Sequence, residues 1–394
     1  MHGTLFDDER MSMADALEQT RQSLLSYGQH YRHWAIAYSG GKDSTCVLAV
    51  VLRLLRSGAV PPPESLTVLY ADTRMELPPL QESAMATLQA VRGMGYNAVR
   101  VLPELDNRFM VYMLGRGVPP PSNTFRWCTE RIKIRPMLHH LRSLRDSCGE
   151  KLLMLTGVRL GESAARDKRI SLSCSRDKGE CGQGWFTEST PESVADTLAP
   201  LLHWRVCHVW DWLAVESPKD GLATQTVAQV YDADLEGSAN EAAARTGCVG
   251  CNLASQDFSL QRILKRPEWS HLEPLRRLKP LYALLKDQSR RLRKAGELRA
   301  DGSPAVNQGR LGPLTFEARL WGLEQVLEIQ ADINMEAGRL DREEYYLIDF
   351  TEQTRIRELI AAETWPQGWS GEEPVGDSLD YDLFRDGTIQ SRLF

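Results

Sequence analysis

The 394-residue sequence predicts an α/β fold with a twisted, mostly parallel sheet and a helical C-terminal region. Short apolar runs with the length of buried strands support the sheet, and helical patterns separate the first three of them. The runs cover residues 34–38, 66–70, 98–102 and 151–157. The first run leads through a glycine turn into a helix at 44–55, which is how a parallel α/β unit begins. In such sheets the ligand binds beyond the carboxyl ends of the strands.

Three regions are expected along the chain. Residues 1–215 should form the catalytic α/β domain, with a polar, cysteine-containing insertion at about 171–191. Residues 216–370 show helical patterns and no convincing strand pattern, which predicts a helical accessory region; it contains the Cys248 and Cys251 pair. Residues 371–394 are acidic and predict a loosely ordered tail.

Composition restricts the classes of function. The formal net charge is −6, so contact with a nucleic acid requires a local basic patch. No apolar run is long enough to span a membrane, and residues 1–10 lack the pattern of a secretory signal, so we expect a cytoplasmic protein. The eight cysteines are then expected to be thiols or metal ligands rather than disulfides.

A phosphate-binding loop is predicted at the turn after the first strand. Its residues are Ser39, Gly40, Gly41, Lys42, Asp43 and Ser44. Adjacent glycines let the backbone N–H groups point into one concavity, and the following helix adds positive potential there. The two serine hydroxyls and the lysine charge suit phosphate oxygens. The spacing differs from that of the Walker loop.

Charged residues at other strand ends extend the predicted site. Asp43 or Asp72 is suited to hold Mg²⁺ near a pyrophosphate, although a strand-end cap is an equally good interpretation of Asp72. The segment GVRLGESAAR at 157–166 follows the fourth strand. Its Arg159 and Arg166 have the fork geometry that grips phosphate.

Cysteines predict a metal centre. Cys128 lies in the cation-rich segment FRWCTERIKIRP, and Cys248 and Cys251 form a C-x-x-C pair flanked by glycines. With one of Cys174 or Cys181 they would provide four thiolates, which suit either zinc or a [4Fe–4S] cluster. The other thiols, at Cys46, Cys148 and Cys207, are interpreted as structural.

Several segments together resemble known families. SGGKDS resembles the PP-loop of N-type ATP pyrophosphatases, and GVRLGESAAR resembles a segment of phosphoadenylylsulfate reductases and of the small ATP sulfurylase subunit. The full set is similar to DndC-type proteins of DNA phosphorothioation, including the SspD branch. That set is YSGGKDST, FRWCTERIKIRP, GVRLGESAAR, WRVCHVWDWL, GCVGC and GPLTFEAR.

The resemblance implies a PP-loop (adenine nucleotide α-hydrolase-like) fold and the cleavage of ATP to AMP and pyrophosphate. A DNA phosphate oxygen would be adenylated and then replaced by sulfur. The resemblance favours a [4Fe–4S] cluster over zinc; Trp127 stands where adenylylsulfate reductases have a cysteine, so Cys174 or Cys181 would replace that ligand. The implied partners are DNA, a cysteine desulfurase as sulfur source, and other proteins of the phosphorothioation system.

Two alternative functions remain. One is an adenylylsulfate or phosphoadenylylsulfate reductase, whose phosphate loop usually differs from SGGKDS. The other is a tRNA thiolation enzyme, against which the GPLTFEAR segment argues.

A basic stretch predicts where DNA binds. Cations are dense between residues 262 and 299, and Arg290, Arg291 and Arg293 are the predicted DNA contacts. Trp269 or Tyr282 is expected to stack on an exposed base. The alternative interpretation is a solvated helical face, or ion pairs with the acidic tail.

Overall fold

The computed structural model describes residues 11–162, 164–176, 179–180, 182–187, 193–231, 247–254, 256–299, 301–307, 309–384 and 388–392. Contacts divide the chain into two compact units. The first is Met1–Asp72, Glu76–Leu102 and Ile134–Thr246; the second is Thr73–Met75, Pro103–Lys133 and Gly247–Phe394. This division differs from the predicted boundary at 215/216, because the segment with Cys128 packs with the C-terminal part of the chain.

The first unit is built on one sheet, and the predicted α/β class is confirmed. Among the described residues, seven strands follow the order β3-β2-β1-β4-β7-β6-β5. The parallel strands are β1 (His33–Tyr38), β2 (Ser65–Ala71), β3 (Asn97–Val101), β4 (Leu152–Leu155) and β7 (Ala195–Ala199). Trp34 pairs with Leu66 of β2 on one side and with Leu153 of β4 on the other. The four predicted runs therefore form the centre of the sheet and one of its edges.

Part of the predicted insertion extends the sheet. Strand β6 (Trp185–Thr187) pairs antiparallel with β7, and β5 (Gly179–Glu180) pairs antiparallel with β6. The Phe186 ring stacks on Tyr27, with 4.7 Å between the ring centroids. This apolar contact explains why a segment of mostly polar sequence is held on the sheet.

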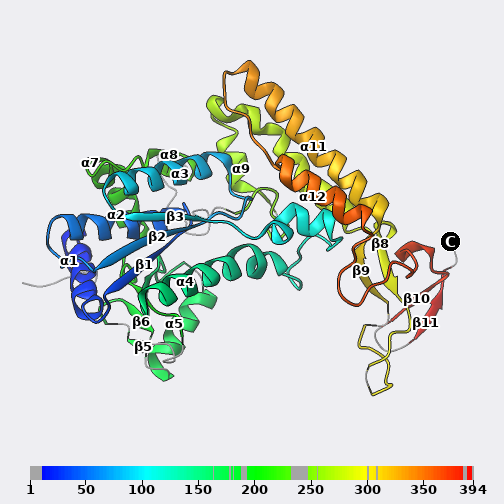
Figure 1. Ribbon diagram of the computed structural model, residues 1–394, viewed down its shortest axis with the longest axis horizontal. Coiled ribbons are helices and arrows are strands. Elements are labelled where there is room, and N and C mark those ends of the chain that lie inside the picture. Colours follow the sequence, from blue (N-terminus) through cyan, green and yellow to red (C-terminus); the bar gives the residue numbers. More distant parts are fainter. Residues whose placement is uncertain are drawn as a thin grey trace, which may run out of the picture. The chain divides into compact units, whose positions relative to one another are not determined.

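Helices cover both faces of this sheet. They include α1 (Met13–Ser23), α2 (Lys42–Arg56), α3 (Pro78–Gly93), α4 (Arg135–Cys148), α5 (Ala164–Arg176), α6 (Val206–Asp211), α7 (Ser217–Lys219) and α8 (Gln225–Val230), with π-helical turns η1 (Leu24–Gly28) and η5 (Trp212–Glu216). In Figure 1, α3 and α8 lie on one side of the sheet and α4 lies on the other. Under α4, Leu141 packs with Ala35, Leu69, Val101 and Leu152 in a buried cluster.

The second unit combines helices with two hairpins. Its helices include η2 (Leu105–Asn107), η3 (Val111–Gly115), α9 (Phe258–Ile263), η6 (Pro267–Arg277), α10 (Leu278–Leu285), η7 (Gln288–Arg290), α11 (Phe316–Arg339), α12 (Phe350–Ala361) and η8 (Gly376–Ser378); η4 (Thr129–Ile134) leads into α4. The hairpins are β8 (Arg291–Lys294) with β9 (Arg310–Leu314), and β10 (Tyr381–Leu383) with β11 (Ile389–Ser391). The prediction of a region without strands was wrong, and the predicted loose tail contains a short hairpin.

The GPLTFEAR segment builds the core of the second unit. Thr315 accepts a hydrogen bond from the Ala318 N–H and so caps α11. Four residues further on, Arg319 is fully buried, and its guanidinium donates to the carbonyls of Leu314, Gly115 and Thr364 at 3.0, 3.3 and 2.7 Å. Its charge also lies 4.3 Å from the centre of the Trp365 ring. The segment therefore has a structural role.

Burial lowers the pKa of Arg319 to about 9. The side chain still carries its charge at neutral pH, because its surroundings provide carbonyl oxygens and aromatic faces instead of water. Among the described residues, no helix is both long and apolar enough to cross a membrane.

Candidate functional site

The predicted phosphate loop has the expected geometry. It joins the end of β1 to the start of α2, and Gly40 adopts a left-handed φ of 72° that favours glycine. A Cβ at Gly40 would lie 3.2 Å from the Cβ of Ala84, so the turn has little room for a side chain. The hydroxyls of Ser39 and Ser44 are 3.0 Å apart across the loop. The loop is therefore a tight turn at a helix N-terminus, which suits an anion.

Lys42, Asp43 and Arg159 form one buried network at this turn. The Asp43 carboxylate accepts from Lys42 Nζ on one oxygen and from Arg159 Nε on the other, each at 2.6 Å. The Arg159 side chain is only 1% exposed, and it also donates to the carbonyl of Trp204 at 3.0 Å. Burial alone would raise the pKa of Asp43, but the charges of Arg159 and Lys42 outweigh it and hold that pKa below its usual value.

Arg159 contacts the loop carboxylate directly. Its guanidinium donates to Asp43 and to the Trp204 carbonyl, and its predicted role in gripping phosphate stays a prediction. Two cations and one carboxylate leave a net positive charge beside the turn, as a polyphosphate requires. Arg166 lies on α5, but its side chain is outside the described residues, so its predicted role stays a prediction.

Asp72 ends β2 in a fully buried position. Its carboxylate accepts from Arg100 Nε at 2.6 Å and from Gln81 Nε2 at 3.2 Å. These contacts favour the strand-end interpretation of Asp72 over the magnesium interpretation. Both oxygens of Asp43 are also bonded, so Mg²⁺ at Asp43 would have to displace Lys42 or Arg159. The Mg²⁺ site stays a prediction.

Tyr231 is a site residue that the sequence analysis missed. Its hydroxyl accepts from the Lys42 N–H at 3.4 Å, and Lys42 Nζ lies 5.8 Å from the centre of its ring. Trp210 packs against the same ring, with 5.3 Å between centroids. Tyr231 is 189 residues from Lys42 in the sequence, and no local motif marks it.

The three candidate cysteine ligands belong to the second unit. The C-x-x-C pair is a tight turn: the Cys251 N–H donates to the Cys248 carbonyl at 3.1 Å, and the Val249 N–H donates to the Met75 carbonyl at 2.7 Å. Burial raises the pKa of the Cys128 thiol, and the nearby Cys251 thiol raises it further. Cys128 therefore lies in the same compact unit as the C-x-x-C turn.

The ligand set is incomplete within the part of the chain that the structure describes. There, no three His, Cys, Asp or Glu side chains are close enough together to hold a metal ion. Cys181 and the side chain of Cys174 lie outside the described residues, so the fourth ligand stays a prediction. Cys46, by contrast, is fully buried on α2, as expected for a structural thiol.

Of the predicted DNA contacts, Arg290 ends η7, and Arg291 and Arg293 lie in β8 of the β8–β9 hairpin. Arg290 lies over the Trp321 ring at 3.8 Å, and Arg291 donates to the carbonyls of Gly312 and Leu311 at 2.9 and 3.0 Å. Burial lowers the pKa of Arg291 to about 10. Arg293 is 6% exposed, donates to the Gly309 carbonyl and pairs with Asp382.

The carbonyl contacts of Arg291 and the burial of Arg293 weigh against DNA contact by these two arginines, and the pair of Arg293 with Asp382 favours the alternative of ion pairs with the acidic tail. DNA contact by Arg290 stays a prediction. Tyr282 is only 1% exposed, so it is not placed to stack on a base. The guanidinium groups of Arg291 and Arg293 donate hydrogen bonds to backbone carbonyls. These bonds explain why an arginine-rich segment forms a strand.

We expect Arg291→Glu combined with Arg293→Glu to unfold the hairpin. The change leaves carbonyls unpaired and buries two carboxylates, so it should lower the free energy of unfolding by about 3 kcal/mol or more. Thermal unfolding checks this, with the exposed Arg299→Glu as the control variant. A double variant with unchanged stability and weaker DNA binding would restore the DNA-contact interpretation.

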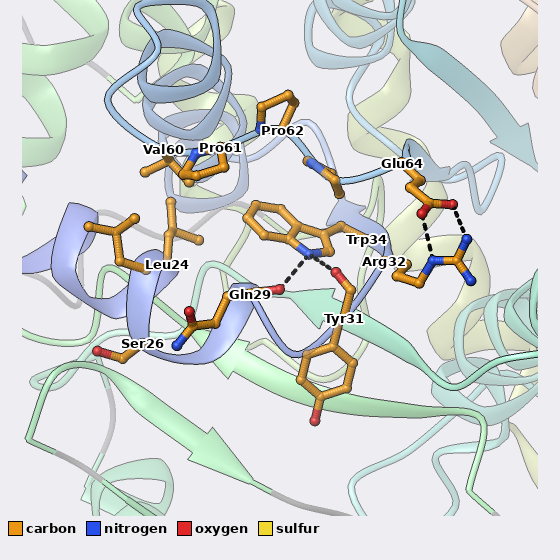
Figure 2. A pocket seen from close by; sticks show the side chains of 13 residues that line it. Leu24, Ser26, Gln29, Tyr31, Arg32, Trp34, Val60, Pro61, Pro62 and Glu64 are labelled. Atoms are coloured by element: carbon orange, nitrogen blue, oxygen red, sulfur yellow. Dashed lines mark hydrogen bonds and ion pairs between the residues drawn. The ribbon is translucent and has the colours of Figure 1, made fainter.

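A separate cavity of about 550 Å³ lies at the opposite end of the strands (Figure 2). Its lining includes Tyr31 just before β1, Trp34 at the start of β1, and Val60 and Pro61 in the segment before β2. The Trp34 indole N–H donates to the carbonyls of Tyr31 and Gly28 at 3.0 and 3.3 Å. The cavity borders the amino ends of parallel strands, so it is distinct from the loop that follows the carboxyl end of β1.

Three solved structures were compared with the chain. The FMN adenylyltransferase of Candida glabrata, in complex with FMN and the ATP analogue AMPCPP, is 15% identical, with a TM-score of 0.34 over 54% of this chain and 60% of its own. The phosphoadenylyl-sulfate reductase of Candida auris, a phosphate complex, is 10% identical, with a TM-score of 0.33 over 56% and 90%. The U34-tRNA thiolase of Methanococcus maripaludis, with its [4Fe-4S] cluster, is 13% identical, with a TM-score of 0.33 over 69% and 79%.

The comparison with protein-family models identifies one domain in the chain. No curated protein sequence matches the chain. Residues 33–220 match the family model of the phosphoadenosine phosphosulfate reductase domain, and this range contains both the loop at 39–44 and Arg159. Residues 33–220 are therefore similar to a phosphoadenosine phosphosulfate reductase domain.

Proposed function

We propose that this protein is a PP-loop ATP pyrophosphatase that activates a DNA backbone phosphate for sulfur incorporation. The observation that carries the proposal is the network of Lys42, Asp43 and Arg159 in a tight glycine turn at the carboxyl end of β1. The match of residues 33–220 to a domain of sulfur metabolism supports it. The resemblance of six segments to DndC-type proteins supports DNA as the acceptor.

The network suggests how ATP is held. The backbone N–H groups after Gly40 and the hydroxyls of Ser39 and Ser44 bind the departing β- and γ-phosphates. Lys42 exchanges its contact with Asp43 for a phosphate oxygen, while Arg159 keeps the carboxylate in place. Mg²⁺, when bound, neutralises the charge that develops on pyrophosphate.

The reaction then has two displacements. A non-bridging DNA phosphate oxygen attacks the α-phosphorus of ATP, and pyrophosphate leaves with the electrons of the broken P–O bond. Sulfide (HS⁻), which excess thiol releases from the desulfurase persulfide by reducing its S–S bond to a disulfide, then attacks the DNA phosphorus, and AMP leaves with the former DNA oxygen. The chain's part is to position the reactants and to stabilise negative charge on the leaving groups.

An assay for sulfur in DNA tests the proposal. The protein, purified anaerobically, is mixed with ATP, DNA, cysteine, a cysteine desulfurase and the other proteins of the phosphorothioation system. Mass spectrometry of the digested DNA should then detect phosphorothioate dinucleotides only when ATP is present. Thiolated tRNA, or reduction of an adenylylsulfate, without sulfur in DNA would support one of the alternative enzymes instead.

A [4Fe–4S] cluster is part of the proposal. We propose Cys128 and the pair Cys248 and Cys251 as cluster ligands, because thiolates are what such clusters require; within the described residues these three thiols do not come close enough together to hold a metal ion. When bound, the cluster would supply iron sites at which sulfur binds. The chain's own contribution is to hold the cluster by the C-x-x-C turn.

Serine at Cys128, Cys248 or Cys251 is expected to remove the brown absorbance and the bound iron, because a hydroxyl is a poor iron ligand. Iron and sulfide analysis after anaerobic purification measures the loss. Cys207→Ser, which changes an exposed thiol of the first unit, is the control and should keep the cluster. A colourless wild-type protein that contains zinc would contradict the cluster and indicate a structural zinc site.

A further inference from the structure

Tyr231 brings a hydroxyl to the N-terminus of α2, inside the phosphate loop. The hydroxyl oxygen lies 3.4 Å from the Lys42 backbone nitrogen and accepts its N–H. A Cβ at Gly41, the residue before Lys42, would be only 3.2 Å from the same oxygen. Lys42 begins α2, so its N–H has no acceptor within the helix. The hydroxyl therefore contacts a donor that the proposed function assigns to a phosphate oxygen.

The fold of the first unit fixes the Tyr231 ring in this position. Tyr231 caps the C-terminus of α8 and is 6% exposed. Helix α8 packs beside α3 (Figure 1), and the Trp210 ring of α6 lies against the Tyr231 ring with 5.3 Å between centroids. Because the ring is enclosed, an anion that enters the loop meets the hydroxyl at a fixed place.

The separation of the hydroxyl from the Lys42 nitrogen suits an acceptor that both groups share. A distance of 3.4 Å is long for an N–H···O hydrogen bond, whose usual range is about 2.7–3.2 Å. Two donors at this separation both reach one oxygen that lies about 2.9 Å from the nitrogen and about 2.7 Å from the hydroxyl. A tyrosine hydroxyl donates as well as accepts, so it can turn its hydrogen towards such an oxygen.

The charge at this point favours an anionic acceptor. Lys42 and Arg159 together carry two positive charges beside the single negative charge of Asp43. The start of α2 adds positive potential, and Lys42 Nζ lies 5.8 Å from the centre of the Tyr231 ring. An oxygen of a polyphosphate fits these surroundings, because it is charged and accepts hydrogen bonds without needing to donate one.

We propose that Tyr231 is a binding residue for the pyrophosphate part of ATP, and that its hydroxyl donates to the same phosphate oxygen as the Lys42 N–H. This inference rests on the proposed function, which assigns the β- and γ-phosphates to the loop. The contact does not serve the adenosine or the α-phosphate, so Tyr231 favours ligands that carry a pyrophosphate group. The hydrogen bond strengthens as pyrophosphate leaves, because negative charge grows on its oxygens.

Tyr231→Phe removes the hydroxyl and keeps the ring. Titration calorimetry with Mg²⁺ present should give dissociation constants for ATP and for inorganic pyrophosphate about tenfold or more above those of the wild type, since a hydrogen bond to a charged group is lost. The dissociation constant of AMP should not change. Tyr31→Phe is the matched control: the Tyr31 hydroxyl donates to Asp196 at 2.6 Å, and Tyr31 lies before β1, away from the loop that follows this strand. This variant should keep all three constants.

The outcomes separate this inference from the proposed function. A wild type that binds neither ATP nor pyrophosphate contradicts both. Binding by the wild type with unchanged affinities in Tyr231→Phe contradicts the role of Tyr231 alone. Tighter binding by the variant also contradicts it, because the hydroxyl would then compete with phosphate for the Lys42 N–H. Equal weakening of AMP and ATP contradicts it as well, since the substitution would then disturb the whole site.

Discussion

Lys42→Ala is expected to lower the rate of pyrophosphate release by about 10²–10³-fold, the usual loss when a charge-stabilising donor is removed from a reacting centre. The fold should survive, because alanine is the best helix former for the first position of α2. Asp43 keeps its bond to Arg159 in the variant, so no carboxylate is left unpaired. A coupled pyrophosphate assay at saturating ATP measures the rate.

The control for Lys42 is another lysine of the same unit. Lys219 is 60% exposed and pairs with Glu216 one helical turn away, so Lys219→Ala should keep the wild-type rate. Asp43→Ala should be as slow as Lys42→Ala, since the carboxylate holds Lys42 and Arg159 together. If Lys42→Ala released pyrophosphate at the wild-type rate, residues 39–44 would not be the phosphate-binding loop.

Arg319→Met is expected to lower the free energy of unfolding of the second unit by about 3 kcal/mol or more. Three backbone carbonyls, of Leu314, Gly115 and Thr364, lose their donor inside the fold, and each unpaired group costs about 1–3 kcal/mol. The stacking of the charge on the Trp365 ring is lost as well. Denaturant or thermal unfolding measures the change.

Arg339→Met on the same helix is the matched control. Arg339 is 72% exposed and pairs with Glu336 within α11, so its loss should change stability by less than about 0.5 kcal/mol. Equal effects of the two substitutions would show that Arg319 does not hold the carbonyls together in solution.

Local patterns predicted the centre of the first unit well. Strands β1 to β4 are short apolar runs followed by turns, and this pattern needs no information from distant residues. The loop at 39–44 was predicted for the same reason, since its glycines, charges and neighbouring strand and helix are contiguous. The cysteine segments were also recognised locally, but their assignment to one unit came from the fold.

Contacts between residues that are far apart in the sequence could not be predicted from it. Tyr231 reaches Lys42 from the end of α8, and nothing near it in the sequence marks this contact. Arg291 and Arg293 were predicted to form a basic DNA-binding surface, but in the structure they donate to backbone carbonyls. The sequence shows their charge but not which carbonyls surround them. Arg159 was predicted to be a site residue, but its contact with Asp43 was not predicted. This contact exists because the segment after β4 lies close to the start of α2, and the sequence does not show that proximity.

The products of ATP cleavage test the central claim most directly. The anaerobically purified protein is incubated with ATP, Mg²⁺, DNA and a sulfur source, and phosphorus NMR follows the nucleotide. The proposed function predicts AMP and pyrophosphate in equal amounts, with both absent in Lys42→Ala. The appearance of ADP and phosphate, or intact ATP under all of these conditions, would contradict it.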